Sequence, residues 1–367
     1  MKAARITEPN EPLNVEEVEL PQLEGSEVLV KIKASGVCHS DIHLWEGGYQ
    51  GPDNTFIKAT DRGVRYPLTP GHEIAGTVEE VGNRVHNTNK FVKGDQVIVY
   101  PWIGEGLCPA CLAGQENLCD DPRSLGIYRD GGYAEYVLVP NYTYLIKINE
   151  DEGEDGSSTN TNNKLDLNFA STLSCSSLTA YSAVKNANLR PYDSLVVVGS
   201  GGLGLNAIQL AKSLYGVNTI AIDLNNDKLE IAKKNGADET INPKEEDPVK
   251  RINEITHNRG TEVIIDFVNS SKSVETNLKL LRKRGKLILV GLFGGEVKLN
   301  LLTLPTKAYT LSGSYNGTRE ELLELVSIAK KGIIKSVVSE KFTLDQATEA
   351  LTKLKEGKIE GRGVINP

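Results

Sequence analysis

The fold is decided by the segment Leu195-Val196-Val197-Val198-Gly199-Ser200-Gly201-Gly202-Leu203-Gly204, in which an apolar run leads directly into a glycine-rich turn. Residues 202–214 continue it with the apolar spacing of a helix. The glycine pattern alone is weak, because a chain with 35 glycines produces chance matches. The apolar run before it and the helical pattern after it predict the first strand–turn–helix step of a parallel sheet.

The second half of the chain continues this alternation. Apolar runs at 219–223, 263–267 and 286–291 predict further buried strands, and residues 227–235 predict a helix. Such alternation indicates a doubly wound α/β domain, whose parallel sheet is covered by helices on both faces. We expect residues 313–367 to rejoin the first part of the chain.

The glycine turn has the features of a dinucleotide site. Gly199 permits the tight turn, Gly201 lets the backbone approach a pyrophosphate, and Gly204 lets helix and strand pack closely. The helix start offers free N–H groups to the phosphates.

Asp223 ends the next strand, where its carboxylate can accept from both adenosine ribose hydroxyls and would repel a 2′-phosphate. No arginine follows in 224–226, so we expect NAD rather than NADP. The alternative is a glycine turn that only packs. The predicted cofactor contacts of the turn are Gly199, Gly201, Gly202, Leu203 and Gly204.

The first half of the chain is β-rich. Its apolar patterns predict strands at 13–20, 27–34, 74–81, 96–99 and 133–140. Residues 101–122 have no helical or strand periodicity but hold three of the five cysteines, so we expect a loop that needs a cross-link to stabilise it. Residues 149–164 contain no apolar side chain and cannot bury enough surface to offset the entropy of ordering. We interpret them as a solvated loop, and a binding role is the less favoured alternative.

Length and charge limit the classes of function. A chain of 367 residues has room for two domains. Its formal net charge of −8 argues against a nucleic-acid partner, which would require a basic face. No run approaches the roughly 18 apolar residues of a membrane span, and the N-terminus has no apolar signal segment. We therefore expect a cytoplasmic protein, in which three bunched cysteines suggest metal ligation before disulfides.

The densest reactive chemistry lies in Gly36-Val37-Cys38-His39-Ser40-Asp41-Ile42-His43, and its partners lie further along, at Gly71-His72-Glu73 and Cys175. Cys38, His72 and Cys175 are far apart in sequence, as suits a catalytic metal assembled by a fold. Zinc accepts thiolates and imidazole, and with three protein ligands it keeps a fourth position for water or substrate. Taken singly, Cys175 could be an ordinary buried thiol and His72 a satisfied core histidine.

The spacing Cys108-x2-Cys111-x7-Cys119 is typical of a structural zinc site on a loop. A closed site needs four ligands. Glu105, three residues before Cys108, is the expected fourth ligand. The alternative is that Glu105 is solvated and the site is weak or empty.

Together these residues resemble the zinc-dependent alcohol dehydrogenases of the medium-chain dehydrogenase/reductase family, whose catalytic zinc has two cysteines and one histidine. The similarity covers nearly the whole chain, and Pro101-Trp102-Ile103-Gly104-Glu105-Gly106 looks most like the tetrameric NAD-dependent enzymes of thermophilic archaea. The resemblance implies a GroES-like β-barrel catalytic domain at 1–172 and 313–367, with a structural-zinc lobe at 101–122, and a Rossmann domain at 173–312. Two departures are the glutamate in place of a lobe cysteine and the polar addition at 150–164.

The resemblance assigns the catalytic zinc to the three scattered ligands and gives roles to the residues around them. Glu73 is expected as a transient ligand, and Asp41 is expected to orient His72. Ser40 takes the alcohol proton, and His43 relays it to solvent together with the nicotinamide ribose.

The resemblance also implies contacts with cofactor, substrate and partners. Further cofactor contacts are expected at His39 and Arg362 (pyrophosphate), Thr179 (nicotinamide) and Lys228 (adenosine ribose). The substrate pocket is expected at Tyr49, Trp102 and Ile127, each of which could equally be there for packing. The expected partners are two zinc ions per chain, NAD(H), a small alcohol or aldehyde, and other copies of the chain, with a tetramer favoured over a dimer.

Other interpretations remain open from the sequence. Polyol and threonine dehydrogenases of the same family usually place an acidic ligand where this chain has Cys175, which favours simple alcohols. A semialdehyde or aldehyde reductase would use the same ligands in the opposite direction. Zinc-free quinone reductases lack these ligands. A zinc-thiolate storage or redox-sensing protein would not need the dinucleotide turn with Asp223.

Overall fold

The computed structural model describes residues 1–86, 88, 90–148 and 165–367. The chain divides into two compact units. Unit 1 consists of Met1–Gly47, Ala59–Leu178 and Gly317–Pro367, and unit 2 consists of Gly48–Lys58 and Thr179–Asn316. The polar stretch 149–164, interpreted above as a solvated loop, lies outside the described residues. In the ranges that are described, no helix is long and apolar enough to cross a membrane.

Unit 2 is built on a six-stranded parallel sheet. Its strands are β10 (Ser194–Val198), β11 (Asn218–Ile222), β12 (Glu239–Ile241), β13 (Thr261–Asp266), β14 (Leu281–Leu289) and β15 (Thr310–Gly313). They lie in the order β12-β11-β10-β13-β14-β15, and every neighbouring pair is parallel. Counted along the chain this order is 3-2-1-4-5-6, that of a doubly wound dinucleotide-binding sheet. The predicted Rossmann-type α/β fold is confirmed.

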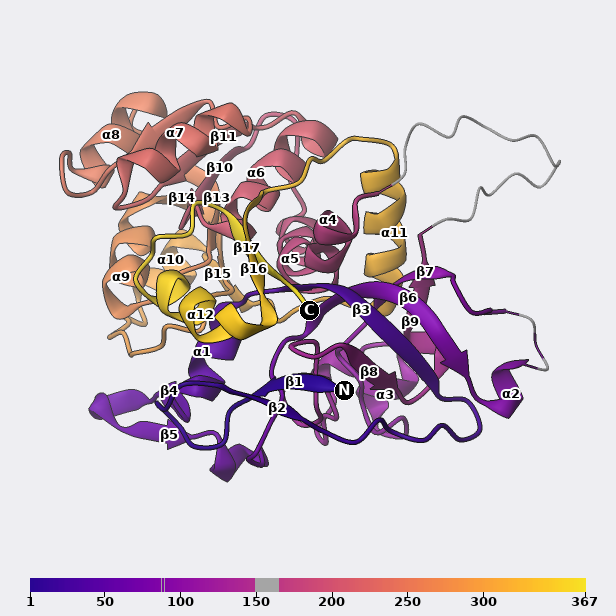
Figure 1. The fold of residues 1–367 in the computed structure, drawn as a ribbon. Coiled ribbons are helices and arrows are strands. Elements are labelled where there is room, and N and C mark those ends of the chain that lie inside the picture. Colours follow the sequence, from indigo (N-terminus) through magenta and orange to yellow (C-terminus); the bar gives the residue numbers. More distant parts are fainter. Residues whose placement is uncertain (87, 89, 149–164) are drawn as a thin grey trace, which may run out of the picture. The chain divides into compact units, whose positions relative to one another are not determined.

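The helices of unit 2 are one that precedes β10 in the chain and five that connect consecutive strands of the sheet (Figure 1). They are α5 (Leu178–Ala187), α6 (Gly202–Tyr215), α7 (Asn226–Lys234), α8 (Pro248–Ile255), α9 (Ser271–Leu280) and α10 (Thr303–Lys307). Helices α7, α8 and α9 begin at the side-chain caps Asn225, Asp247 and Ser270. Helix α6 begins at Gly201 with no side-chain cap. Its first-turn N–H groups are thus left for another acceptor.

Unit 1 contains a mostly antiparallel sheet assembled from distant parts of the chain. Its strands are β3 (Val28–Gly36), β6 (Glu73–Val81), β7 (Gln96–Val99), β8 (Tyr136–Val139), β9 (Leu145–Lys147), β16 (Val338–Thr343) and β17 (Arg362–Asn366). Their order is β16-β17-β3-β6-β7-β9, and β8 also pairs with β3. Strand β17, at the yellow end of the chain in Figure 1, pairs with the end of β3, which leads directly to Cys38.

The other strands and the α-helices of unit 1 lie outside this sheet. They are β1 (Lys2–Arg5), β2 (Asn14–Glu17), α1 (His39–Trp45), α2 (Asn83–His86), α3 (Pro109–Leu112), α4 (Leu167–Thr172), α11 (Arg319–Lys330) and α12 (Ala347–Lys355). Val28, Val30 and Ile32 of β3 enter one core cluster, as the alternation that predicted the strand implies. Leu29, between them, is also buried, so both faces of this part of the strand are covered.

Two features of the division into units differ from what the sequence indicates. The hairpin of β4 (Gly48–Gln50) and β5 (Phe56–Lys58) belongs to unit 2, although the residues on both sides of it belong to unit 1. The sequence places the domain boundaries at 172/173 and 312/313, whereas the compact units part at 178/179 and 316/317.

Gly204→Ala is expected to destabilise unit 2, because a Cβ at this position would overlap the carbonyl oxygen of Gly199, and only a backbone shift could relieve the overlap. Overpacking of this kind costs about 1–3 kcal/mol in free energy of unfolding, which chemical denaturation measures. Gly201→Ala is the matched control, since its Cβ would meet no atom within 4 Å. Equal losses in the two variants would contradict the packing role of Gly204.

Candidate functional site

A first cluster of side chains in unit 1 unites three distant parts of the chain. Cys38 precedes α1, His72 precedes β6, and Cys175 lies in a π-helical turn, Leu173–Ser177, between α4 and α5. All three residues are buried, and their ligand atoms lie within 4.8 Å of one another. The structure therefore brings together the residues that the sequence predicts as catalytic metal ligands.

The imidazole of His72 is oriented by Asp41. Its Nδ1 atom lies 3.1 Å from Oδ1 of Asp41, so Nδ1 carries the donated proton and the lone pair is left on Nε2. This Nε2 atom is buried and has no hydrogen-bond partner in the part of the chain that the structure describes. A buried nitrogen left in this state costs free energy unless something else binds it. The orphaned atom fits a metal ligand.

The spacing of the two thiols also fits zinc. Sγ of Cys38 and Sγ of Cys175 are 4.0 Å apart. Two sulfurs bound to a tetrahedral zinc, at the usual Zn–S length, would be about 3.8 Å apart. Two thiolates and one imidazole, with a fourth position left over, form the donor set of a catalytic zinc site.

Four hydrogen bonds hold the carboxylate of Asp41. Oδ1 accepts from the N–H of Gly71 at 3.1 Å in addition to His72. Oδ2 accepts from the N–H of Cys38 at 2.9 Å and from the hydroxyl of Tyr133 at 3.1 Å. The sequence predicts the role of Asp41 but not that of Tyr133, which lies 92 residues away from it along the chain.

Glu73, next to His72, forms a buried ion pair with Arg362. Nε of Arg362 donates to Oε2 of Glu73 at 3.0 Å, and Nη2 donates to Oε1. Oε1 also accepts, at 2.8 Å, from the N–H of Ser176 in the turn that carries Cys175. Burial raises the pKa of Glu73, and the guanidinium opposes this effect. Arg362, expected at the pyrophosphate, is here bound to Glu73.

The turn around Cys175 is further supported by Trp102. Nε1 of this indole donates to the carbonyl oxygen of Ser174 at 3.0 Å. The indole ring also packs on the imidazole of His72, with ring centroids 5.2 Å apart. Trp102 therefore contacts the surroundings of two of the three predicted ligands. No sequence pattern predicts the π-helical turn, although such turns are frequent at functional sites.

The residues predicted to move a proton lie on α1. Ser40 and His43 are three residues apart and share one face of the helix. Oγ of Ser40 lies 3.9 Å from Sγ of Cys38. Burial lowers the pKa of His43, which keeps its imidazole neutral near pH 7. His39, at the start of the helix, is exposed.

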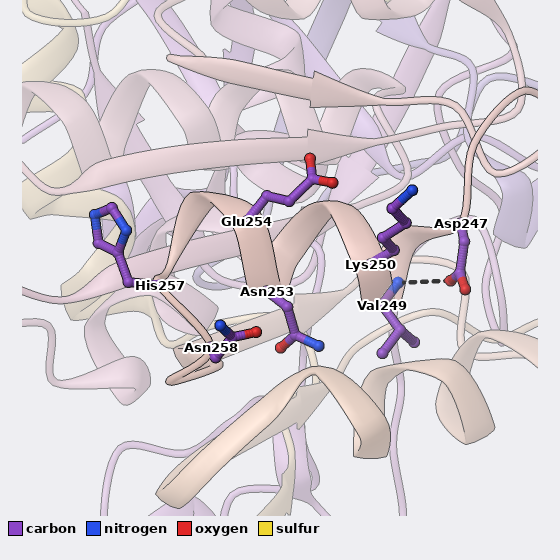
Figure 2. A pocket seen from close by; sticks show the side chains of 7 residues that line it. All are labelled: Asp247, Val249, Lys250, Asn253, Glu254, His257 and Asn258. Carbon is purple, nitrogen blue, oxygen red and sulfur yellow. Dashed lines mark hydrogen bonds between the residues drawn. The ribbon is translucent and has the colours of Figure 1, made fainter.

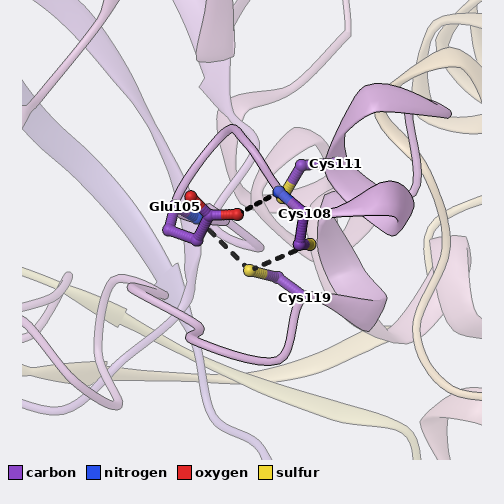
Figure 3. A group of neighbouring side chains, drawn as sticks. All are labelled: Glu105, Cys108, Cys111 and Cys119. Carbon is purple, nitrogen blue, oxygen red and sulfur yellow. Dashed lines mark hydrogen bonds between the residues drawn. The ribbon is translucent and has the colours of Figure 1, made fainter.

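A second cluster consists of Glu105, Cys108, Cys111 and Cys119, whose ligand atoms also lie within 4.8 Å of one another. Figure 3 shows the four side chains gathered at one point of the loop. Sγ of Cys108 and Sγ of Cys119 are 3.8 Å apart, as a tetrahedral zinc requires. Glu105 accepts from the N–H groups of Cys108 and Leu107, and these bonds lower its pKa. An ionised carboxylate thus lies beside the three sulfurs, and this set of four donors fits a structural zinc.

The glycine turn of unit 2 lies between β10 and α6, as predicted. Asp223 directly follows β11, and its carboxylate accepts from the N–H of Ser200 at 2.8 Å and from the N–H of Asn225 at 3.0 Å. Gly201 faces open space, since a Cβ there would meet no atom within 4 Å. An uncapped helix start beside an open backbone fits a phosphate-bearing cofactor.

The other predicted contact residues are distributed over both units. In unit 2, Thr179 is buried in α5, Lys228 is half-buried in the first turn of α7, and Tyr49 is half-buried on β4. In unit 1, Trp102 and Ile127 are buried.

A surface hollow of about 600 Å³ lies on α8 (Figure 2). Its lining side chains are Asp247, Val249, Lys250, Asn253, Glu254, His257 and Asn258. All of them come from one helix and its two ends. The hollow is therefore the exposed face of α8, and none of the predicted site residues lines it.

Comparisons with known proteins agree with this geometry. Residues 24–150 match the family model for an alcohol dehydrogenase GroES-like domain, and residues 202–331 match the model for a zinc-binding dehydrogenase. NAD-dependent alcohol dehydrogenases of Sulfurisphaera tokodaii and Saccharolobus solfataricus are 42% and 40% identical to this chain, each over 100% of both sequences. The crystal structure of the alcohol dehydrogenase from Aeropyrum pernix matches with a TM-score of 0.87 and 35% identity, over 100% of both chains.

Arg362→Leu is expected to lower the free energy of unfolding by about 3–5 kcal/mol, because removing one partner leaves the charge of Glu73 buried and unpaired. Urea denaturation of the purified variant measures the loss. The double variant Glu73→Gln, Arg362→Leu should recover part of the stability, since it leaves no charge buried. Losses that simply add in the double variant would show that the two residues are not coupled.

Proposed function

Because this chain belongs to the zinc-binding alcohol dehydrogenases and is an NAD-dependent oxidoreductase of alcohols and aldehydes, we propose that Cys38, His72 and Cys175 hold its catalytic zinc. The observation that carries the proposal is the buried Nε2 atom of His72, which has no partner among the described residues and belongs to a cluster with two thiols. Asp41 keeps the lone pair on this atom.

The chemistry divides between the bound groups and the chain. A zinc ion at this site supplies Lewis-acid polarisation of the substrate oxygen. Bound NAD(H) supplies the hydride acceptor or donor. Ser40 relays the proton of an alcohol, accepting it while its own hydroxyl proton passes on, since its hydroxyl lies at the edge of the ligand cluster, 3.9 Å from Sγ of Cys38. His43 passes the proton on from the same face of α1, and its neutral imidazole is ready to accept it.

The cofactor is assigned to the carboxyl ends of the strands of unit 2. Its pyrophosphate is assigned to the uncapped start of α6, where Gly201 leaves the backbone open. Asp223 is assigned to the adenosine ribose, because its carboxylate bridges the glycine turn and the start of α7. The remaining proposed contacts are His39, Thr179, Lys228 and Arg362 for the cofactor, and Tyr49, Trp102 and Ile127 for the substrate.

A second, structural zinc is proposed at Glu105, Cys108, Cys111 and Cys119. Its support is the convergence of three sulfurs and one carboxylate, at a sulfur spacing that suits tetrahedral zinc. Thiolate ligation at both sites requires reduced cysteines, so we place the enzyme in a reducing compartment, the cytoplasm.

A tetramer is proposed for the assembled enzyme. In unit 2, β15 ends the sheet of the described strands, and Leu301 and Leu302, shortly before it in the chain, are 77% and 69% exposed. In unit 1, Leu107 and Leu112 of the second cluster's loop are 78% and 74% exposed. Open sheet edges and exposed apolar side chains mark interfaces. Two such surfaces support the two kinds of contact that a tetramer of D2 symmetry needs.

Cys38→Ser is expected to remove one of two zinc ions per chain and to abolish alcohol oxidation, while the fold persists. A serine hydroxyl does not replace a thiolate ligand of zinc. Atomic absorption measures the zinc, far-UV circular dichroism measures the fold, and a panel of alcohols and aldehydes with NAD(H) and NADP(H) measures turnover. Unchanged turnover in this variant would refute the central assignment.

The same zinc measurement tests the second site. Glu105→Ala should lose the other zinc ion, whereas Asp120→Ala, which removes an exposed carboxylate from the same loop, should keep both. Wild-type protein that holds a single zinc ion would contradict ligation by Glu105.

The double variant Leu107→Glu, Leu112→Glu is expected to assemble as a dimer, because charged side chains at these positions cannot be buried between copies of the chain. Light scattering coupled to gel filtration measures the mass of the assembly. A monomeric wild-type enzyme would refute the proposed assembly, and a variant that remains tetrameric would exclude this loop from the interface.

A further inference from the structure

We propose that Tyr133 is a positioning residue of the catalytic metal centre: its buried hydroxyl fixes the carboxylate of Asp41, and through it the direction of the His72 lone pair. The inference rests on the proposed function, because it assumes that the cluster of Cys38, His72 and Cys175 binds the catalytic zinc.

The hydroxyl of Tyr133 is one of four donors that the described residues offer to Asp41. It donates to Oδ2 at 3.1 Å, and the other described donor to this atom is the N–H of Cys38. Tyr133 is completely buried. If its hydroxyl were removed, Oδ2 would keep only the N–H of Cys38 among the described donors, and the loss of a buried hydrogen bond to a charged group is costly. The carboxylate would then be held less firmly, and its Oδ1 atom holds Nδ1 of His72.

The backbone around Tyr133 is fastened to the segment that carries His72. The N–H of Gly131 donates to Thr69 at 2.8 Å, and the N–H of Gly132 donates to Gly71 at 2.6 Å. The N–H of Tyr133 donates to the carbonyl of Pro70 at 3.0 Å. Three bonds to three consecutive carbonyl-bearing residues fix the position of the tyrosine relative to the ligand that follows them. The position of the hydroxyl relative to His72 is therefore fixed by the backbone.

Gly71 allows this arrangement. Its φ of +92° lies in the left-handed region, which glycine adopts at little cost. A Cβ at this position would overlap the ring of Tyr133. The ring therefore packs directly against the backbone beside His72, and this close contact brings the hydroxyl to Asp41.

Tyr133→Phe distinguishes the role of the hydroxyl from that of the ring, because it keeps the packing of the ring and deletes only the hydrogen-bond donor. The matched control is Tyr100→Phe. Tyr100 is also completely buried in unit 1, but its hydroxyl donates to the backbone carbonyl of Gly317 at 2.9 Å and does not contact Asp41. The two substitutions remove the same atom from equally buried sites.

The test measures metal binding itself. Chelator competition gives the affinity of the catalytic zinc, and the visible spectrum of the cobalt(II)-substituted protein reports the geometry of its ligands. Tyr133→Phe should weaken the catalytic zinc about 10-fold, the low end of the effect of residues that orient a ligand, and shift the cobalt spectrum. Tyr100→Phe should change neither. In an Asp41→Asn background, Tyr133→Phe should have no further effect.

Three outcomes decide between the alternatives. An unchanged zinc affinity and cobalt spectrum in Tyr133→Phe would overturn the inference, as would an equal weakening in Tyr100→Phe, which would indicate a general loss of packing. An undiminished effect in the Asp41→Asn background would show that the hydroxyl does not act through Asp41. A zinc content that does not fall in Cys38→Ser would instead refute the proposed function and, with it, the inference.

Discussion

The first ligand cluster depends on the buried carboxylate of Asp41. An isolated charge in a protein interior is very costly, so a buried carboxylate must be surrounded by donors. Asp41 receives two backbone N–H groups, one imidazole and one phenol. Because three of these donors belong to or adjoin Cys38 and His72, the bonds that satisfy the carboxylate also set the two proposed ligands in place. The buried carboxylate of Asp41 therefore organises the proposed metal centre.

Glu73 holds Cys175, the third proposed ligand, in a similar way. Its carboxylate joins the segment of His72 to the N–H of Ser176, which follows Cys175, and to the guanidinium of Arg362. The π-helical turn that presents Cys175 is held on its other side by Trp102. Two buried carboxylates therefore connect the three proposed ligands, although 137 residues separate Cys38 from Cys175.

Much of this architecture can be predicted from the sequence, for local reasons. The apolar run that ends in Gly199 and the helix that follows it are adjacent in the chain, and their pattern specifies a strand–turn–helix unit. The proposed ligands Cys38, His72 and Cys175 of the first cluster, and Glu105 of the second cluster, are identifiable because few side chains bind zinc, and because their segments resemble those of a known family. Each of these signals is contained in a few consecutive residues.

The parts that the sequence does not predict depend on distant contacts. Arg362 and Glu73 are 289 residues apart, and neither has a local signal that it will be buried with the other. Tyr133 resembles any core tyrosine until the fold places Asp41 beside its hydroxyl. The π-helical turn has no sequence rule, because one extra residue per turn is tolerated only where tertiary contacts stabilise it. The assignment of the 48–58 hairpin to unit 2 likewise follows from contacts made elsewhere in the chain.

The position of Arg362 has a consequence for biosynthesis. Strand β17 comes later in the chain than every other described strand, and Arg362 is its first residue. While the chain is being made, Glu73 is present but the cation that neutralises it has not yet been synthesised. We therefore expect the buried ion pair to form only after the segment that contains β17 has left the ribosome. A polypeptide that lacks β17 would keep every proposed zinc ligand and still leave the charge of Glu73 unmatched beside them, so we expect this strand to be needed for a stable metal centre.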